Sequence, residues 1–523
     1  MISRLQPDRR SLLLMGATGL LATPLLAADM LAEGWVDVRR FGAKGDGSAI
    51  DTPAINKAID YAAARGGGTV YVPAGTYACY SIRLKSRVGL HLDQGAIILA
   101  AKAPESGVGG YDLAEPQDPS FEPYQDYGHN HWRNSLIWGD GLTDIAITGG
   151  GLIWGKGLGR GSDGYRQDPF GPGTGNKTIA LKNCRNVLLR DFRILEGGWF
   201  GLLLTGVDNL TIDNLLIDTN RDGMDIDCCR NVRVSNCTVN SPYDDGICPK
   251  SSFALGYPRS TENLTIENCM VTGNYEVGSV LAGTWKKHAP ESAKYIVGRI
   301  KLGTESNGGF KNITIANCTF DGCQGLALET VDGANLEDVT ISNITMRGCV
   351  SSPIFMRLGR RMRGPKERPV GTLKRVMISN VSSSGASLLP SIIAGLPDHP
   401  VEDIKISDVY LQQVGGAPES MAHLNPPANE DHYPEPNMFG DLPASGFFIR
   451  HARNVEFNNV EVAVQQPDPR PAYRIEHVDG ADFFHVRAPG GSLFSLEDVR
   501  NFAVSSCAQV PDQRLAAVRS TVI

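Results

Sequence analysis

The sequence predicts an all-β protein, a single-stranded right-handed parallel β-helix with a helix capping its N-terminal end. Three observations carry this prediction. A polar–aliphatic unit recurs at a spacing of 22 to 23 residues. Apolar residues alternate with period 2 inside each unit, which indicates short strands with one buried face. Fifty-nine glycines and a charged fraction of only 20% are typical of a turn-rich β protein.

The helix signal lies near the start of this architecture. Pro53 is suited to a first helical turn, Thr52 is expected to cap the helix, and Ile55 and Ile59 share one apolar face before a run of three glycines. Strands are expected to follow at 69–72, 77–84 and 88–92. We expect residues 36–105 to form the cap and the first coils, because a helix there covers strand edges that would otherwise stay unpaired.

The repeat is clearest in the units that begin at Asn186, Asn209 and Asn231, where the steps are 209 − 186 = 23 and 231 − 209 = 22. It recurs from Asn263, Asn312, Asp338, Arg375, Asp403, Asn454 and Asn501. One unit cannot bury its apolar face alone, so consecutive units must stack, with Asn or Asp at the corners between strands. Residues 36–523 are therefore expected to form the β-helix; a β-sandwich with chance periodicity is the alternative.

Four segments interrupt the repeat: 104–135, 155–175, 274–298 and 414–445. Stacked coils tolerate extra residues at their corners, so insertions are expected to mark the functional face. Several of the insertions carry aromatic side chains, which either stack on sugar rings or pin the loops to the surface.

The N-terminus indicates export. Arg9 and Arg10 precede a short apolar run that ends near Ala28, the pattern of a twin-arginine signal over residues 1–28. An ordinary secretory signal is the alternative. We expect a periplasmic or secreted protein with no membrane span, because no later apolar run reaches the ~18 residues that a membrane helix needs.

The cysteines indicate how the core packs, and the net charge bears on the class of partner. Cys237, Cys269 and Cys318 occupy equivalent repeat positions, which predicts a buried stack; a disulfide between Cys318 and Cys323 is a weaker alternative. A net charge of −7 argues against a nucleic-acid partner.

Two acidic clusters lie one repeat apart. Asp222, Asp225 and Asp227 form the first, and Asp244 with Asp245 forms the second. Stacked strands lie ~4.8 Å apart, so acids from both clusters should crowd together, and at least one pKa should rise. A protonated acid beside an ionised base is what glycoside hydrolysis requires, with ~6.5–9.5 Å between carboxyls for inversion. Asp225 and Asp227 are expected to be structural residues that cap turns or belong to the side-chain ladders at the corners.

These clusters resemble the motifs of the polygalacturonases, glycoside hydrolase family 28. The family's Asn-Thr-Asp-Gly-x-Asp-Ile is matched by 220–226, and its Asp-Asp-Cys-Ile-Ala-x-Lys-Ser by 244–251. The likeness begins at Phe41 and reaches about residue 350. It implies a right-handed parallel β-helix and an inverting hydrolase without metal or cofactor. By this resemblance Asp244 is the general acid, Asp222 and Asp245 hold and deprotonate the attacking water, and Asn220 and Lys250 bind substrate.

The chain departs from the family at two places. A Gly-His-Gly motif is expected on the coil after the Asp pair, yet neither 275–278 nor 298–303 supplies a histidine. The family's Arg-Ile-Lys, which reads a substrate carboxylate, aligns with Ala327-Leu328-Glu329. Arg299 and Lys301 are predicted to supply the missing charge from a neighbouring coil. The resemblance thus implies an atypical branch.

The predicted function is inverting cleavage of α-galacturonosyl-type linkages in pectic polysaccharides or oligosaccharides, of the polygalacturonase, exo-polygalacturonase or rhamnogalacturonan hydrolase type. We expect a monomer, with large loops at the cleft favouring exo action. Two alternatives stay open. A polysaccharide lyase would use Arg299 as base and calcium held by the acids, and a non-catalytic β-helix would bind glycans only.

Overall fold

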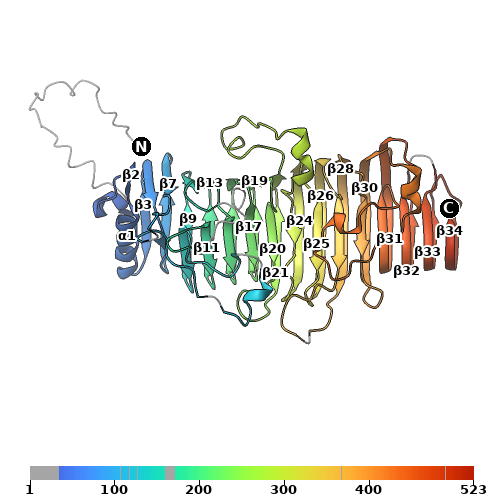
Figure 1. Cartoon of the computed structure of the whole chain (residues 1–523), viewed down its shortest axis with the longest axis horizontal. Helices are drawn as coiled ribbons and strands as arrows, with labels where there is room; N and C mark the ends of the chain where they lie inside the picture. Colours follow the sequence, from blue (N-terminus) through green and yellow to red (C-terminus); the bar gives the residue numbers. More distant parts are fainter. Residues whose placement is uncertain are drawn as a thin grey trace, which may run out of the picture. The chain divides into compact units, whose positions relative to one another are not determined.

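The computed structural model describes residues 35–106, 108–116, 118–125, 128–159, 171–366, 368–488 and 491–523. Over residues 36–523, parallel strands from successive coils stack side by side along one axis (Figure 1). This confirms the parallel β-helix. The predicted export signal at 1–28 lies outside the described residues.

The N-terminal cap contains the predicted helix, α1 (Thr52–Ala64). Thr52 does not cap it, so that expectation was wrong: Asp51 is the N-cap residue, and the Thr52 hydroxyl accepts the Tyr80 N–H at 2.7 Å. The expected strand at 77–84 is divided between two strands. The N-terminal strands and the 3₁₀ turn are β1 (Trp35–Asp37), η1 (Val38–Phe41), β2 (Asp46–Ile50), β3 (Gly68–Val72), β4 (Gly75–Cys79), β6 (Val88–Leu92) and β7 (Ala96–Ala100).

Each coil of the N-terminal half has three strands. The first face is a sheet of β5 (Ile82–Arg83), β8 (Ile137–Asp140), β11 (Lys177–Lys182), β14 (Phe200–Thr205), β17 (Asp222–Asp227) and β20 (Ile247–Lys250). The second face has β9 (Thr143–Thr148), β12 (Arg185–Arg190), β15 (Asp208–Asp213), β18 (Arg230–Ser235) and β21 (Thr261–Glu267). The third has β10 (Leu152–Trp154), β13 (Arg193–Leu195), β16 (Leu216–Asp218), β19 (Thr238–Asn240) and β22 (Met270–Thr272).

In the C-terminal half the strands lengthen and run around the corners. The long strands are β24 (Phe310–Asp321), β26 (Leu336–Cys349), β28 (Leu373–Gly385), β30 (Val401–Gly415), β31 (Phe447–Gln466), β32 (Tyr473–Phe484) and β33 (Phe494–Ser505), and the antiparallel β34 (Gln513–Val522) pairs with β33. The first face continues through β23 (Lys301–Leu302), β25 (Leu326–Thr330), β27 (Ile354–Leu358) and β29 (Ser391–Ala394). Short 3₁₀ turns lie in the insertions: η2 (Glu122–Tyr124), η3 (Pro290–Tyr295), η4 (Glu419–His423) and η5 (Pro436–Phe439).

The repeat asparagines occupy corners, as predicted. Asn186, Asn209 and Asn231 have φ of 57°, 54° and 57°, a left-handed conformation that asparagine tolerates. Each also donates its amide to the side-chain oxygen one coil earlier: Asn209 to Asn186 at 2.8 Å, and Asn231 to Asn209 at 3.1 Å. Each of these asparagines thus adopts the backbone conformation of the turn and also links its coil to the preceding one by a side-chain hydrogen bond.

The interior is filled by the inward side chains of all three faces in one continuous apolar core. Cys237, Cys269 and Cys318 are buried there on neighbouring coils, which confirms the predicted stack. The disulfide alternative was wrong, because Cys318 and Cys323 are both free thiols.

Candidate active site

Three carboxylates meet at one end of the first-face strands. Asp222 begins β17, and Asp244 and Asp245 lie just before β20 on the next coil. The Gly223 N–H donates to the Asp245 carbonyl at 3.0 Å, which fixes the register of the two coils. One oxygen from each of Asp222, Asp244 and Asp245 lies within 4.8 Å of the others. The predicted stacking of the two acidic clusters is therefore observed.

Gly223 permits this close approach. A Cβ built on Gly223 would lie 2.4 Å from the Gly246 carbonyl oxygen, a distance that no side chain tolerates. Glycine is therefore required after Asp222. The resulting spacing of nearest oxygens is shorter than the ~6.5–9.5 Å carboxyl separation expected from the sequence.

Asp245 is the ionised member of the cluster. Its Oδ1 accepts from Arg299 Nε at 2.9 Å, and its Oδ2 lies 3.2 Å from Lys301 Nζ. Burial raises the pKa of Asp245, but the positive charges of Lys301 and Arg299 outweigh burial and lower it to about 2. This carboxylate is available as a base near neutral pH.

Asp244 is held from the preceding coil. Arg221 Nη2 donates to Asp244 Oδ2 at 2.6 Å, and the Arg221 guanidinium carbon lies 4.3 Å from the Trp199 ring centre. Burial raises the pKa of Asp244, and this exceeds the lowering by Arg221.

Asp222 has the opposite electrostatic setting from Asp245. Burial, followed by the charges of Asp225 and Asp244, raises its pKa well above the usual value. Its Oδ1 is buried without a hydrogen-bond partner among the described residues. The cluster thus combines an ionised carboxylate with carboxyls of raised pKa, as the crowding of like charges predicts.

A second row of charges lies behind the cluster. The Asp225 carboxylate bonds His129 Nε2 at 2.8 Å, and Lys250 Nζ lies 3.9 Å from Asp225 and 3.2 Å from Glu305. The sequence had favoured a corner role for Asp225, which instead belongs to this charged row. Asp227 does have a structural role, since it accepts the backbone N–H and hydroxyl of Ser252 at 2.8 and 2.5 Å.

Arg299 and Lys301 are buried, at 1% and 2% exposure. Besides Asp245, Arg299 Nη2 contacts Glu435 at 2.5 Å and Glu329 at 4.0 Å, and Lys301 Nζ lies 3.8 Å from Glu329. Burial raises the pKa of Glu329 to about 7 despite the two cations. Both predicted substrate-binding cations are therefore engaged by acids, and their contact with substrate stays a prediction. Asn220 adjoins the centre, where its carbonyl accepts the Tyr243 N–H.

The insertions deliver residues that the sequence motifs could not assign. His129 comes from 104–135, and Tyr433 and Glu435 come from 414–445; the Tyr433 hydroxyl lies 3.3 Å from Lys301 Nζ. In the insertion 274–298, Tyr275 bonds Asp321 at 2.6 Å and packs on Trp285, so these aromatics pin the loop. Residues 160–170 of the insertion 155–175 lie outside the described part.

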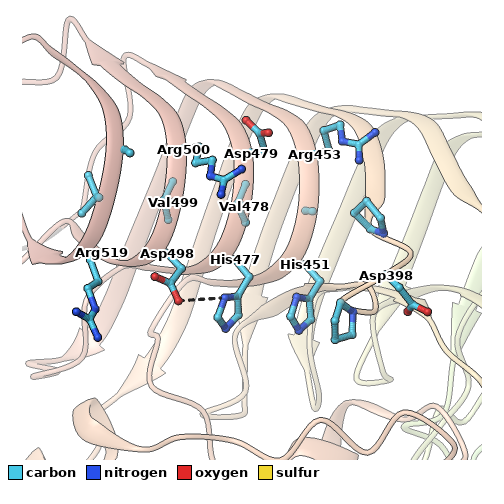
Figure 2. A pocket seen from close by; sticks show the side chains of 15 residues that line it. Asp398, His451, Arg453, His477, Val478, Asp479, Asp498, Val499, Arg500 and Arg519 are labelled. Carbon is cyan, nitrogen blue, oxygen red and sulfur yellow. Dashed lines mark ion pairs between the residues drawn. The ribbon is translucent and has the colours of Figure 1, made fainter.

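A separate hollow of about 760 Å³ lies on the C-terminal coils (Figure 2). His451, His477 and Asp498 stand in a row there, with the imidazoles 4.9 Å apart and His477 Nδ1 3.5 Å from Asp498. All three have the left-handed φ of corner residues. The row therefore continues the corner stacking, and none of the residues that line this hollow belongs to the carboxylate cluster.

Among the described residues, Asp222, Asp244 and Asp245 are also the one group of three acids, histidines or cysteines with donor atoms near enough to share a cation. Arg221 pairs with Asp244, and Arg299 and Lys301 pair with Asp245. Helices able to cross a membrane are not found in the described part of the chain.

Comparisons with known proteins give matches over parts of the chain. The family described as "Rhamnogalacturonase A/epimerase, pectate lyase-like" matches residues 35–93, and "Right handed beta helix region" matches 173–287. A probable polygalacturonase of Vitis vinifera is 27% identical over 311 residues, covering 53% of this chain and 59% of the relative. An exo-poly-alpha-D-galacturonosidase of Dickeya chrysanthemi is 27% identical over 268 residues, covering 42% of each. The chain thus matches about half the length of these relatives.

The likeness extends to solved structures. A hyperthermoactive exopolygalacturonase from Thermotoga maritima superposes with a TM-score of 0.58 at 16% identity, covering 94% of this chain and 95% of that one. At this identity the superposition shows the fold, and with the family match it confirms the right-handed parallel β-helix. The chain is accordingly a right-handed parallel β-helix protein that is similar to polygalacturonases over about half of its length.

Proposed function

We propose that this protein is an inverting glycoside hydrolase that cleaves galacturonosyl-type linkages in pectic polysaccharides or oligosaccharides. One observation carries the proposal: three carboxyl groups from adjacent coils lie within 4.8 Å, and their pKa values are shifted in opposite directions. An acid and a base side by side are the groups that glycoside hydrolysis needs.

The spacing suits a water nucleophile. One oxygen of Asp222 and one of Asp245 lie within 4.8 Å of each other. A single water molecule placed between them can hydrogen-bond to both at ~2.7–2.8 Å. In the proposed step the water oxygen attacks the anomeric carbon and its proton passes to ionised Asp245. The glycosidic C–O bond breaks as Asp244 gives its proton to the leaving oxygen. Short carboxyl distances alone favour retention, so the anomeric form of the product is the deciding measurement.

The insertion 414–445 supports attack from a chain end. It covers the first face beyond the carboxylates: Arg357 donates to the Ala428 carbonyl at 3.0 Å, and Arg450 to the Pro426 carbonyl at 2.8 Å. Phe439 and Leu442 of the insertion pack on Phe355 of β27. A glycan lying along this face is blocked on that side, so we propose exo action.

The test is incubation of the purified protein with pectic oligosaccharides, followed by NMR to identify the released sugar and its first anomeric form. An inverted product is expected, and Asp244→Asn is expected to abolish its release. Asp338→Asn, at an exposed corner far along the chain, serves as the matched control.

Two other results would change the assignment. Ultraviolet absorbance from an unsaturated uronate product, lost on adding a chelator, would establish the lyase. Glycan binding with no product from any substrate would establish a binding protein.

Export to the periplasm or beyond is proposed from residues 1–28 alone. Cell fractionation of a variant with both Arg9→Lys and Arg10→Lys tests it.

A further inference from the structure

The charged groups around the cluster constrain the substrate further. We propose that the sugar bound beside Arg299, Lys301 and Glu329 carries no negative charge, so that the preferred substrate is a neutral or carboxyl-esterified stretch of a pectic glycan. This inference rests on the proposed hydrolase function and names its substrate class.

The first step is the charge balance of the centre. Seven carboxyl groups gather there: Asp222, Asp225, Asp244, Asp245, Glu305, Glu329 and Glu435. Five basic groups of lysine and arginine pair with them: Arg221, Lys250, Arg299, Lys301 and Arg363. Each of these cations is within 4.0 Å of at least one carboxylate oxygen, so an incoming uronate would have to compete with a fixed acid for every one of them.

The second step is the position of Glu329. Its side chain is fully buried, and its two oxygens lie 4.0 Å from Arg299 Nη2 and 3.8 Å from Lys301 Nζ. Glu435 reaches the same two cations from the insertion 414–445, at 2.5 and 3.9 Å. Two acids from different segments therefore neutralise the pair that would otherwise attract a carboxylate. Glu329 is fully enclosed, so it acts through Arg299 and Lys301 as a positioning residue.

The third step concerns the side chains that a bound sugar can still contact. Asp244 and Arg221 keep 26% and 14% of their side chains exposed, and Tyr433 is 48% exposed. Carboxylates and a phenol suit the hydroxyl donors of a sugar. A substrate carboxylate bound there would have to displace Asp245, Glu329 or Glu435 from Arg299 and Lys301.

The experiment uses a matched pair of substrates: an α-1,4-oligogalacturonide and its carboxyl-reduced form, which share length and linkage and carry a carboxylate or an uncharged hydroxymethyl group at C6. The methyl ester of the same oligosaccharide is a third arm. The wild-type protein is expected to show kcat/KM higher by about ten-fold or more for the uncharged forms, the size of effect that one charge exerts over several ångströms near a protein surface.

Glu329→Gln removes, with little change of shape, a carboxyl group that contacts Arg299 and Lys301 and is ionised above pH about 7. It is expected to raise kcat/KM for the charged oligosaccharide relative to the reduced one by about five-fold or more. The matched control is Glu476→Gln, another buried acid paired with arginines, Arg450 and Arg474, on distant coils. That variant should leave the ratio between the two substrates unchanged.

The outcomes separate this inference from the function on which it rests. Faster cleavage of the charged form by the wild-type protein overturns the inference and leaves the hydrolase intact. A ratio that Glu329→Gln does not move, or that Glu476→Gln moves equally, also overturns it. If neither form is cleaved, and calorimetry with Asp244→Asn shows no tighter binding of the uncharged form, both proposals fail together.

Discussion

Replacing Glu329 with glutamine should remove a distinct part of the pH dependence of stability. Glu329 is fully buried on β25, and its pKa is raised from 4.5 to about 7, first by burial, with Lys301 and Arg299 opposing. A carboxyl whose folded pKa lies above its unfolded value favours the folded state below the unfolded value. That stability is lost as pH rises through the folded pKa.

The magnitude follows from the size of the shift. A rise from 4.5 to about 7, at 1.36 kcal/mol for each pKa unit, corresponds to at most about 3 kcal/mol. Relative to Glu329→Gln, the wild-type protein should therefore lose up to about 3 kcal/mol of unfolding free energy between pH 4.5 and pH 7.5. Other titrating groups contribute to both proteins, and the difference between the proteins largely removes them.

Equilibrium unfolding in urea at several pH values between 4 and 8 measures this difference, with unfolding and refolding curves compared for reversibility. The same series on Glu476→Gln shows whether any buried acid gives the effect. A difference between wild type and Glu329→Gln that stays constant with pH, or that grows in favour of the wild type as pH rises, would refute the reasoning.

Three further predictions concern the cluster and the coils. Asp244→Asn should lower kcat/KM by at least about a hundred-fold without changing the circular dichroism spectrum, whereas Asp338→Asn should retain activity; this is measured by product release. Arg221→Gln removes a cation that lowers the pKa of Asp244. The basic limb of the pH profile of kcat/KM should therefore move to higher pH. A limb that does not move would contradict a role for this contact. Asn231→Ala breaks the corner ladder and places alanine at φ of 57°, which should cost about 1–2 kcal/mol in urea unfolding.

The sequence was sufficient for the fold because the repeat is local. Period-2 alternation and corner asparagines every 22 to 23 residues specify both the strands and the register of stacking, so Asp222 and Asp245 come together with no long-range information. Thr52 shows the limit of local rules. It is a capping residue type next to Pro53, but its hydroxyl accepts the Tyr80 N–H instead of capping the helix. This tertiary partner is not visible in the sequence.

The electrostatics of the centre required the tertiary structure. The sequence alone determined the stacked coils, the three acids and the departures at Arg299, Lys301 and Glu329, because a repeat converts sequence spacing into spatial spacing. Only the folded chain decided that His129 reaches Asp225 and that Glu435 reaches Arg299, across 96 and 136 residues. Insertions have no repeat to fix their path, so their contacts depend on packing over the first face, and those contacts determine which carboxyl groups keep a proton.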